Sequence, residues 1–174
     1  CADSRVVPSL LTGTAPGELF CVRNIGALLP PSGHDTLNDE GAGLEYAIEV
    51  LGVRNVVVCG HSKCGAMGAL KKGGLPDELS ALKHWAEGAR ALIVDPDAHI
   101  SVDDLTRATS VKQLDHFRSY PVVQRALQNG ELTLSAWFYD VESAEVFEWS
   151  EERERFTAIG EPEARLSRAP GPHG

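Results

Sequence analysis

A short apolar run with a metal-ligand pattern at its end lies near the middle of the chain, in VRNVVVCGHSKCGA over residues 53–66. Three consecutive valines, residues 56–58, are typical of a strand that is covered on both faces. Gly60 interrupts the run, and His61 and Cys64 follow at once with the spacing H-x-x-C. We therefore expect a buried strand over residues 53–59 that leads into a loop carrying two soft metal ligands.

The chain opens on the sequence CADSR, which offers a second thiol and an acid–base pair. Successive side chains alternate along an extended chain, so Cys1, Asp3 and Arg5 are expected to share one face. If this segment lies beside the strand that ends near His61, then Cys1, His61 and Cys64 meet at the carboxyl edge of a parallel sheet. Zinc favours thiolate and imidazole ligands, and a catalytic site leaves its fourth position to water. Asp3 would accept a hydrogen bond from that water, and Arg5 would keep the carboxylate ionised.

The first third of the chain reads as strand, helix, strand. Residues 1–7 resemble the end of a strand that Pro8 closes, and residues 18–23 (ELFCVR) resemble a short buried strand. A helix is expected to begin at Asn38 or Asp39 and to stop at Gly52, with apolar residues repeating at the helical period. With the strand over residues 53–59, this order is typical of a parallel sheet with helices on its faces.

Further along, helical periodicity gives way to alternation with a period of two. We expect a short helix after Cys64, then helices over residues 79–93, 102–119 and 121–127. Apolar residues alternate from Glu131 to Tyr139, and a last strand over residues 144–149 is expected to run antiparallel to it. The predicted fold is α/β, with a central, mostly parallel β-sheet flanked by helices and an antiparallel edge strand.

Composition limits the domain organisation and the partners. A chain of 174 residues with 43% hydrophobic residues fits one domain, which we expect over residues 1–150, followed by a charged extension and flexible tail over residues 151–174. The net charge of −9 argues against nucleic-acid or anionic-membrane surfaces, because both need basic patches.

No apolar run is long enough to span a membrane, and the first residues lack the zones of a signal peptide. Four cysteines are too few for a disulfide scaffold, so we expect a reducing, cytoplasmic environment and read Cys21 and Cys59 as small buried hydrophobic residues.

Five segments in order resemble the β-class carbonic anhydrases, most closely the plant-type and cyanobacterial-type branch. They are CADSRV at residues 1–6, GELFCVRN at 17–24, EYA at 45–47, CGHSKCGA at 59–66 and GELTLSAWFYDV at 130–141. The match runs to about Trp149 with compatible spacing. The resemblance implies one Zn²⁺ per subunit on Cys1, His61 and Cys64, with Asp3 and Arg5 as the dyad that handles zinc-bound water. It implies reversible hydration of CO₂ to bicarbonate and a proton by attack of zinc-bound hydroxide.

The resemblance also implies a CO₂ pocket at a dimer interface, and hence a homodimer or larger homo-oligomer. Phe20, Ile25 and Tyr46 match the residues that line this pocket, and the backbone N–H of Gly65 would lie near the metal-bound oxygen. Ordinary core packing is an equally open interpretation of Phe20, Ile25 and Tyr46. The family also has an upstream helical segment that wraps the neighbouring subunit, and this sequence begins at Cys1 without it.

Two alternative functions share these motifs. The first is hydrolysis of carbon disulfide or carbonyl sulfide on the same scaffold. The second is a non-catalytic, zinc-containing scaffold protein, for instance in a carboxysome, against which the intact pair of Asp3 and Arg5 argues.

Overall fold

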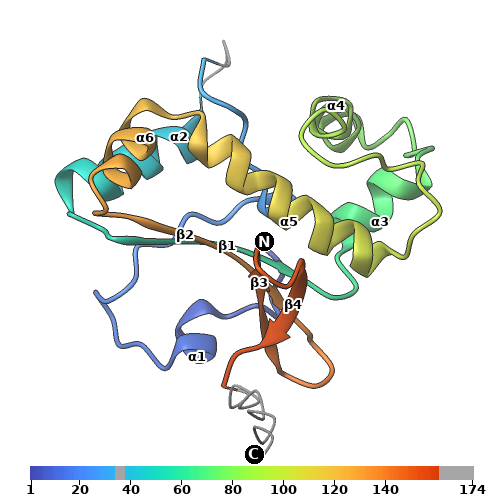
Figure 1. The fold of residues 1–174 in the computed structure, drawn as a ribbon. Helices are drawn as coiled ribbons and strands as arrows, with labels where there is room; N and C mark the ends of the chain where they lie inside the picture. The colour runs from blue at the N-terminus through green and yellow to red at the C-terminus, as the bar shows by residue number, and fades with distance from the viewer. Residues whose placement is uncertain (34–37, 161–174) are drawn as a thin grey trace, which may run out of the picture.

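The computed structural model describes residues 1–33 and 38–160, which form a mixed four-stranded sheet with helices around it (Figure 1). The strands are β1 (Asn55–His61), β2 (Thr133–Tyr139), β3 (Val146–Ser150) and β4 (Arg155–Ala158), in the spatial order β1-β2-β3-β4. β1 pairs with β2 in parallel, and the β2–β3 and β3–β4 pairs are antiparallel. The structure thereby confirms the α/β fold and the antiparallel edge expected from the sequence. The described sheet is mixed rather than mostly parallel, because one of its three pairings is parallel and two are antiparallel.

Helices surround the parallel pair of strands. They are α1 (Pro8–Thr12), η1 (Ile25–Ala27), α2 (Asp39–Glu45), the π-helical turn η2 (Tyr46–Val50), α3 (Gly65–Lys72), α4 (Ser80–Ala89), α5 (Val102–Arg118) and α6 (Pro121–Gln128). In Figure 1, α5 crosses one face of the sheet. α2 and α6 lie near one end of α5, and α3 and α4 lie near its other end. Asn38 caps α2 by accepting a hydrogen bond from the N–H of Gly41, and Gly52 ends this helical segment with a φ of 68°.

α5 lies close against β1 because the strand carries a glycine at the point of contact. A Cβ added to Gly60 would lie 2.5 Å from Ser110 Oγ and 2.8 Å from Thr106 Cγ2, both on α5. The hydroxyls of these two α5 residues donate to carbonyls one turn earlier, of Val102 and Thr106, so both of these hydroxyls have a hydrogen-bond partner. Gly60 therefore sets how closely the helix approaches the carboxyl end of β1.

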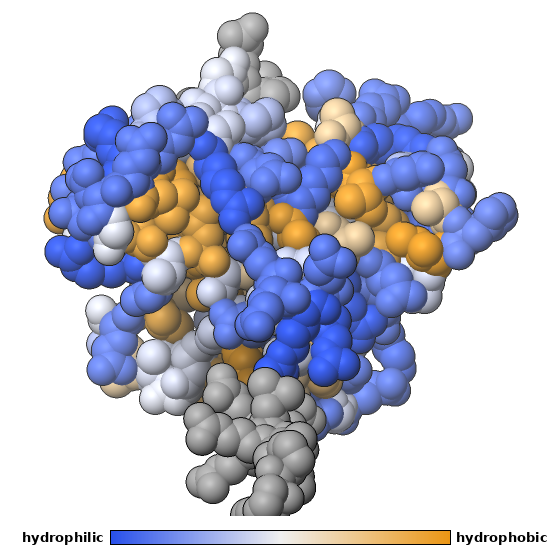
Figure 2. Space-filling model, in the orientation of Figure 1, coloured by the Kyte–Doolittle hydropathy of each residue, from blue (hydrophilic) through white to orange (hydrophobic). Residues whose placement is uncertain are grey.

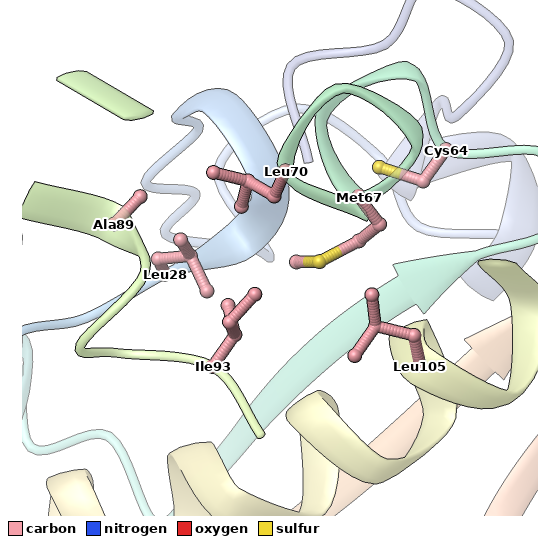
Figure 3. Packing of buried hydrophobic residues seen from close by; sticks show 7 residues of the cluster. All are labelled: Leu28, Cys64, Met67, Leu70, Ala89, Ile93 and Leu105. Atoms are coloured by element: carbon pink, nitrogen blue, oxygen red, sulfur yellow. The ribbon is translucent and has the colours of Figure 1, made fainter. Parts of the chain in front are cut away.

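Beside this contact, an apolar cluster anchors α3 to the rest of the fold. Figure 3 shows Met67 and Leu70 of α3 directed toward Leu28 and Ile93, with Leu105 of α5 below them. Cys64 belongs to the same cluster and is 2% exposed. Packing of α3 in this way fixes the position of the cysteine that immediately precedes it.

Two predicted strands near the N-terminus are not strands in the structure. Residues 1–7 contain a turn at Ser4 and Arg5, and Pro8 begins α1 rather than closing a strand. Residues 18–23 are irregular and exposed, not buried on both faces. One backbone bond, from Ala2 N to the Asn24 carbonyl at 2.7 Å, links the two segments. A strand needs a ladder of such bonds, which an apolar run by itself does not supply.

Other boundaries also differ from the sequence prediction. β1 continues to His61, so this residue lies on the strand rather than in the loop after it. α4 ends at Ala89 instead of residue 93, while α5 and α6 lie within a residue of their predicted bounds. β4 was not predicted, because its sequence RFTA follows a charged run that is typical of a solvent-exposed, irregular segment. The predicted tail lies, from residue 161 on, outside the part of the chain that the structure describes.

The outer surface carries both hydrophilic and apolar residues. Figure 2 shows hydrophilic residues over much of the visible face and two apolar areas, one toward α2 and α6 and one toward α3 and α4. Among the helices described, none is both long and apolar enough to cross a membrane.

Candidate metal centre

Three separate parts of the chain bring metal-ligand side chains together at the carboxyl end of β1. His61 is the last residue of β1, Cys64 precedes α3, and Cys1 lies alongside with its backbone nitrogen 3.4 Å from the Cys59 carbonyl. The donor atoms of Cys1, His61 and Cys64 all lie within 4.8 Å of one another. The cluster is thus the set of residues that the sequence predicted.

The imidazole of His61 is oriented as a metal ligand. Its Nδ1 donates to the carbonyl of Ser62 at 2.9 Å, because a carbonyl oxygen only accepts. The proton therefore lies on Nδ1, and Nε2 carries a lone pair. Nε2 is buried with no hydrogen-bond partner in the described structure, and burial lowers the pKa of the ring. An unpaired buried nitrogen is costly unless something binds it, so the neutral imidazole and the two thiols fit a zinc ion.

The loop between the two ligands is held at several points. Ser62 N–H donates to the Tyr139 carbonyl at 2.9 Å, and the Ser62 hydroxyl accepts from Val141 N–H at 2.9 Å. Tyr139 is the last residue of β2 and Val141 follows it two residues later, and the parallel register places this strand beside β1. The loop therefore depends on the pairing of β1 with β2 for its position.

The acid–base pair forms, although not in the way the sequence suggested. Arg5 Nε donates to Asp3 Oδ1 at 2.9 Å and Arg5 Nη2 donates to Oδ2 at 2.8 Å, which is a bidentate pair. The turn at Ser4 and Arg5 brings the two side chains together, and the backbone N–H of Arg5 adds a third bond to Oδ1 at 2.9 Å. These bonds hold the pKa of Asp3 well below its usual range. Asp3 Oδ2 lies 3.9 Å from His61 Nε2, so the ionised carboxylate faces the metal cluster.

Arg23 supports the same segment and was not assigned a role from the sequence. Its Nη2 donates to the carbonyls of Cys1 at 3.0 Å and Asp3 at 2.8 Å. The residue stands in the run GELFCVRN, but only the folded chain shows that its guanidinium reaches back to the first residues. Arg23 thus ties the irregular segment around residue 23 to the metal cluster.

The other two cysteines lie outside the cluster. Cys59 is partly buried, and burial raises the pKa of its thiol, which favours the protonated form that binds metal poorly. Cys21 is exposed, so the prediction that it is a buried hydrophobic residue is wrong. It lies in the segment that lacks strand pairing, where both faces remain open.

The three residues proposed to contact substrate are partly exposed in the single chain. Phe20, Ile25 and Tyr46 are 46%, 45% and 49% exposed in the single chain, so none of them is a core residue here. The rings of Phe20 and Tyr46 lie 6.0 Å apart, centroid to centroid. Phe20 lines an apolar groove of about 380 Å³ that reaches Cys1 and Cys59, whereas Ile25 and Tyr46 are not among its lining residues. Gly65 begins α3, directly after Cys64.

Comparison with known proteins agrees with this geometry. A sequence profile of the carbonic anhydrase family matches residues 1–146. A carbonic anhydrase of Pseudomonas aeruginosa is 42% identical over 95% of this chain and 78% of its own length. A carbonic anhydrase of Synechococcus elongatus is 40% identical over 95% of this chain, which spans 64% of that relative.

Solved structures show the same fold. The β-carbonic anhydrase CcaA superposes with a TM-score of 0.80 and 36% sequence identity, over 91% of this chain and 80% of that one. A tetrameric β-carbonic anhydrase from Sordaria macrospora, at 21% identity and a TM-score of 0.70, shares the fold over 92% of this chain and 77% of that one. Three findings agree. They are the cysteine, histidine and cysteine at the end of a parallel strand, the family profile that matches most of the chain, and the similarity to these relatives. The chain belongs to the β-class carbonic anhydrases.

Proposed function

We propose that this chain catalyses the reversible hydration of CO₂ to bicarbonate and a proton, with one Zn²⁺ per subunit bound by Cys1, His61 and Cys64. One observation carries the proposal. Two thiols and an unpaired, buried imidazole nitrogen converge within 4.8 Å, and an ion-paired carboxylate faces them.

Zinc bound to these three residues would supply a Lewis acid that makes water a nucleophile near neutral pH. The role proposed for Asp3 is to accept a hydrogen bond from water at the site and so to orient it. Arg5 keeps that carboxylate ionised and fixes both of its oxygens through the bidentate contact. Arg23 holds the backbone on which Asp3 lies.

The substrate is small, apolar and uncharged, so it needs an apolar site beside the nucleophile rather than charged contacts. Phe20, Ile25 and Tyr46 are proposed to provide that site, with the N–H of Gly65 nearby at the start of α3. Their exposure in the single chain supports a second copy that covers them, and therefore a homodimer or larger homo-oligomer.

The first test is stopped-flow CO₂ hydration by protein whose zinc content has been measured. Activity is expected to rise in proportion to bound zinc, to disappear after chelation and to return when zinc is added. Stoichiometric zinc without CO₂ hydration would contradict the proposal. Hydrolysis of carbon disulfide or carbonyl sulfide would then identify the alternative enzyme, and no activity on any of these substrates would favour a scaffold.

A second test addresses the dyad. Asp3→Asn keeps the shape of the side chain but removes the charge, so kcat is expected to fall by about 10²-fold or more while zinc remains bound. Asp115→Asn is the control, because Asp115 pairs with Arg118 on the surface of α5. Equal activity of the two variants would exclude a role for Asp3 in the reaction.

A further inference from the structure

We infer that Asp103 is a positioning residue for the proposed reaction. By binding the backbone of Lys63, Asp103 fixes both the loop between His61 and Cys64 and the guanidinium of Arg5. This inference rests on the proposed function, and its test includes a measurement that does not depend on catalysis.

Lys63 adopts a backbone conformation that non-glycine residues rarely take. Its φ is 53°, in the left-handed region, and it lies between two of the three metal ligands. Such a conformation persists only where the surroundings hold it. Asp103 Oδ1 accepts a hydrogen bond from the Lys63 N–H at 2.7 Å, a short bond to an acidic side chain.

The other side of the same residue contacts the dyad. The Lys63 carbonyl accepts a hydrogen bond from Arg5 Nη2 at 3.2 Å, and the same Nη2 donates to Asp3 Oδ2 at 2.8 Å. Rotation of Lys63 to a negative φ would reorient its peptide groups and disturb both contacts. The bond to Asp103 therefore stabilises the backbone conformation in which Arg5 is held on two sides.

Asp103 itself lies on a rigid support. It is the second residue of α5, whose contact with β1 is set by the absence of a side chain at Gly60. Its neighbour Asp104 makes different contacts: it exchanges hydrogen bonds with Ser101 at 2.7 and 3.0 Å and pairs with Arg107 at 3.2 Å. The two acidic residues both favour the start of α5, but only Asp103 bonds to the metal-ligand loop.

This difference gives a matched experiment. Asp103→Ala, Asp103→Asn and Asp104→Ala are compared by kcat/KM for CO₂ hydration and by the rate at which the zinc-loaded protein loses zinc to excess chelator. Asp103→Ala is expected to lower kcat/KM and to speed zinc loss, each by about tenfold, as loss of one such bond implies. Asp103→Asn, which keeps an acceptor oxygen, should recover most of both effects, and Asp104→Ala should show neither.

A glycine at position 63 tests the origin of the effect, because glycine adopts a positive φ at no steric cost. In the Lys63→Gly background, the same Asp103→Ala change is expected to alter both measurements less than it does in the wild-type chain. Lys63→Gly also removes the ion pair between Lys63 and Glu142, so its own values are the reference for that comparison.

Two results would overturn the inference. Equal kcat/KM and zinc-loss rates for Asp103→Ala and Asp104→Ala would reduce Asp103 to a residue that stabilises the start of α5. An Asp103→Asn variant as impaired as Asp103→Ala would show that charge matters rather than the accepted hydrogen bond. If the wild-type chain binds zinc but does not hydrate CO₂, the proposed function fails, and the zinc-loss rates still decide whether Asp103 holds the loop.

Discussion

At the scale of single residues, the protein itself holds His61 in a tautomer and orientation that suit a metal ligand. The Ser62 carbonyl fixes the tautomer and the orientation of the ring, and burial favours its neutral form. Within the described residues, the consequence is a buried Nε2 without a hydrogen-bond partner, which destabilises the metal-free protein. A metal bound at this site would therefore be coupled to folding stability through this nitrogen.

Zinc is accordingly expected to raise the thermal stability of the metal-free protein. At a free zinc concentration about 1,000 times the Kd, the stabilisation is about 4 kcal/mol, which for a chain of this size raises Tm by about 8–16 °C. Scanning calorimetry with and without zinc measures the shift. Cys64→Ser should abolish it, whereas Cys21→Ser, which changes an exposed thiol outside the cluster, should leave it intact. A zinc-dependent shift that survives Cys64→Ser would place the metal elsewhere.

At the scale of elements, the contact between α5 and β1 determines the geometry near the site. α5 presents Thr106 and Ser110 to the strand and Asp103 to the loop beyond it, so its distance from β1 affects all three contacts. The helix can come this close because position 60 has no side chain.

Gly60→Ala should therefore destabilise the fold by about 1–3 kcal/mol, since the new methyl group would overlap Ser110 and Thr106. Gly68→Ala is the control, because a Cβ there meets no atom within 4 Å and alanine favours the helix α3 by about 0.5–1 kcal/mol. Chemical denaturation of both variants gives the two changes in the free energy of unfolding. A Gly60→Ala variant as stable as the wild type would mean that α5 shifts without cost.

The start of α5 also gives a pH-dependent contribution to stability. The hydrogen bond from Ser101 lowers the pKa of Asp104 in the folded state, so folding favours the ionised carboxylate. This contribution is present above the unfolded pKa of about 3.9 and is lost as the pH falls through the lower folded value. Asp104→Asn should be less stable than wild type near neutral pH, and the difference should shrink below about pH 4. Urea midpoints across this range measure it, and a constant difference would contradict the assignment.

At the scale of the whole molecule, an apolar surface beside α2 is exposed among the described residues of the single chain. Phe20, Val22 and Tyr46 are each nearly half exposed, and Val22 and Phe20 lie against the backbone of α2 at Gly43. A stable interface buries about 800 Å² per partner, and exposed aromatic residues are typical of its centre. Two of the proposed substrate residues, Phe20 and Tyr46, belong to this surface, so assembly and activity should depend on each other.

Val22→Glu is therefore expected to convert the assembled protein to monomers, because it places a charge in an apolar contact. Analytical ultracentrifugation measures the mass, and kcat/KM for CO₂ hydration should fall with it. Leu79→Glu, a similarly exposed position just before α4, should retain the mass of the wild type. If Val22→Glu keeps that mass, the interface lies elsewhere.

The sequence predicted the ligand types of the site and most of the helices. The ligand types, the H-x-x-C spacing and the pair Asp3 and Arg5 are properties of the chain itself, and the donor atoms do converge. The long helix α5 and the alternating strand β2 follow local hydrophobic periodicity, so their bounds were predicted closely. The assignment of roles to these residues in the reaction stays a prediction.

Only the tertiary structure decided what depends on a partner distant in sequence. Residues 18–23 have a strand-like composition but lack a ladder, whereas β4 has an unremarkable sequence and pairs with β3. The hydrogen bonds from Arg23 to the Cys1 carbonyl and from the Lys63 N–H to Asp103 join segments far apart along the chain. Helices can be predicted from a local sequence pattern because each helix hydrogen bond joins residues only four positions apart. A strand, or a side chain such as Arg23 or Asp103, finds its hydrogen-bond partner on a segment that the fold brings beside it. No local sequence pattern specifies which segment that will be.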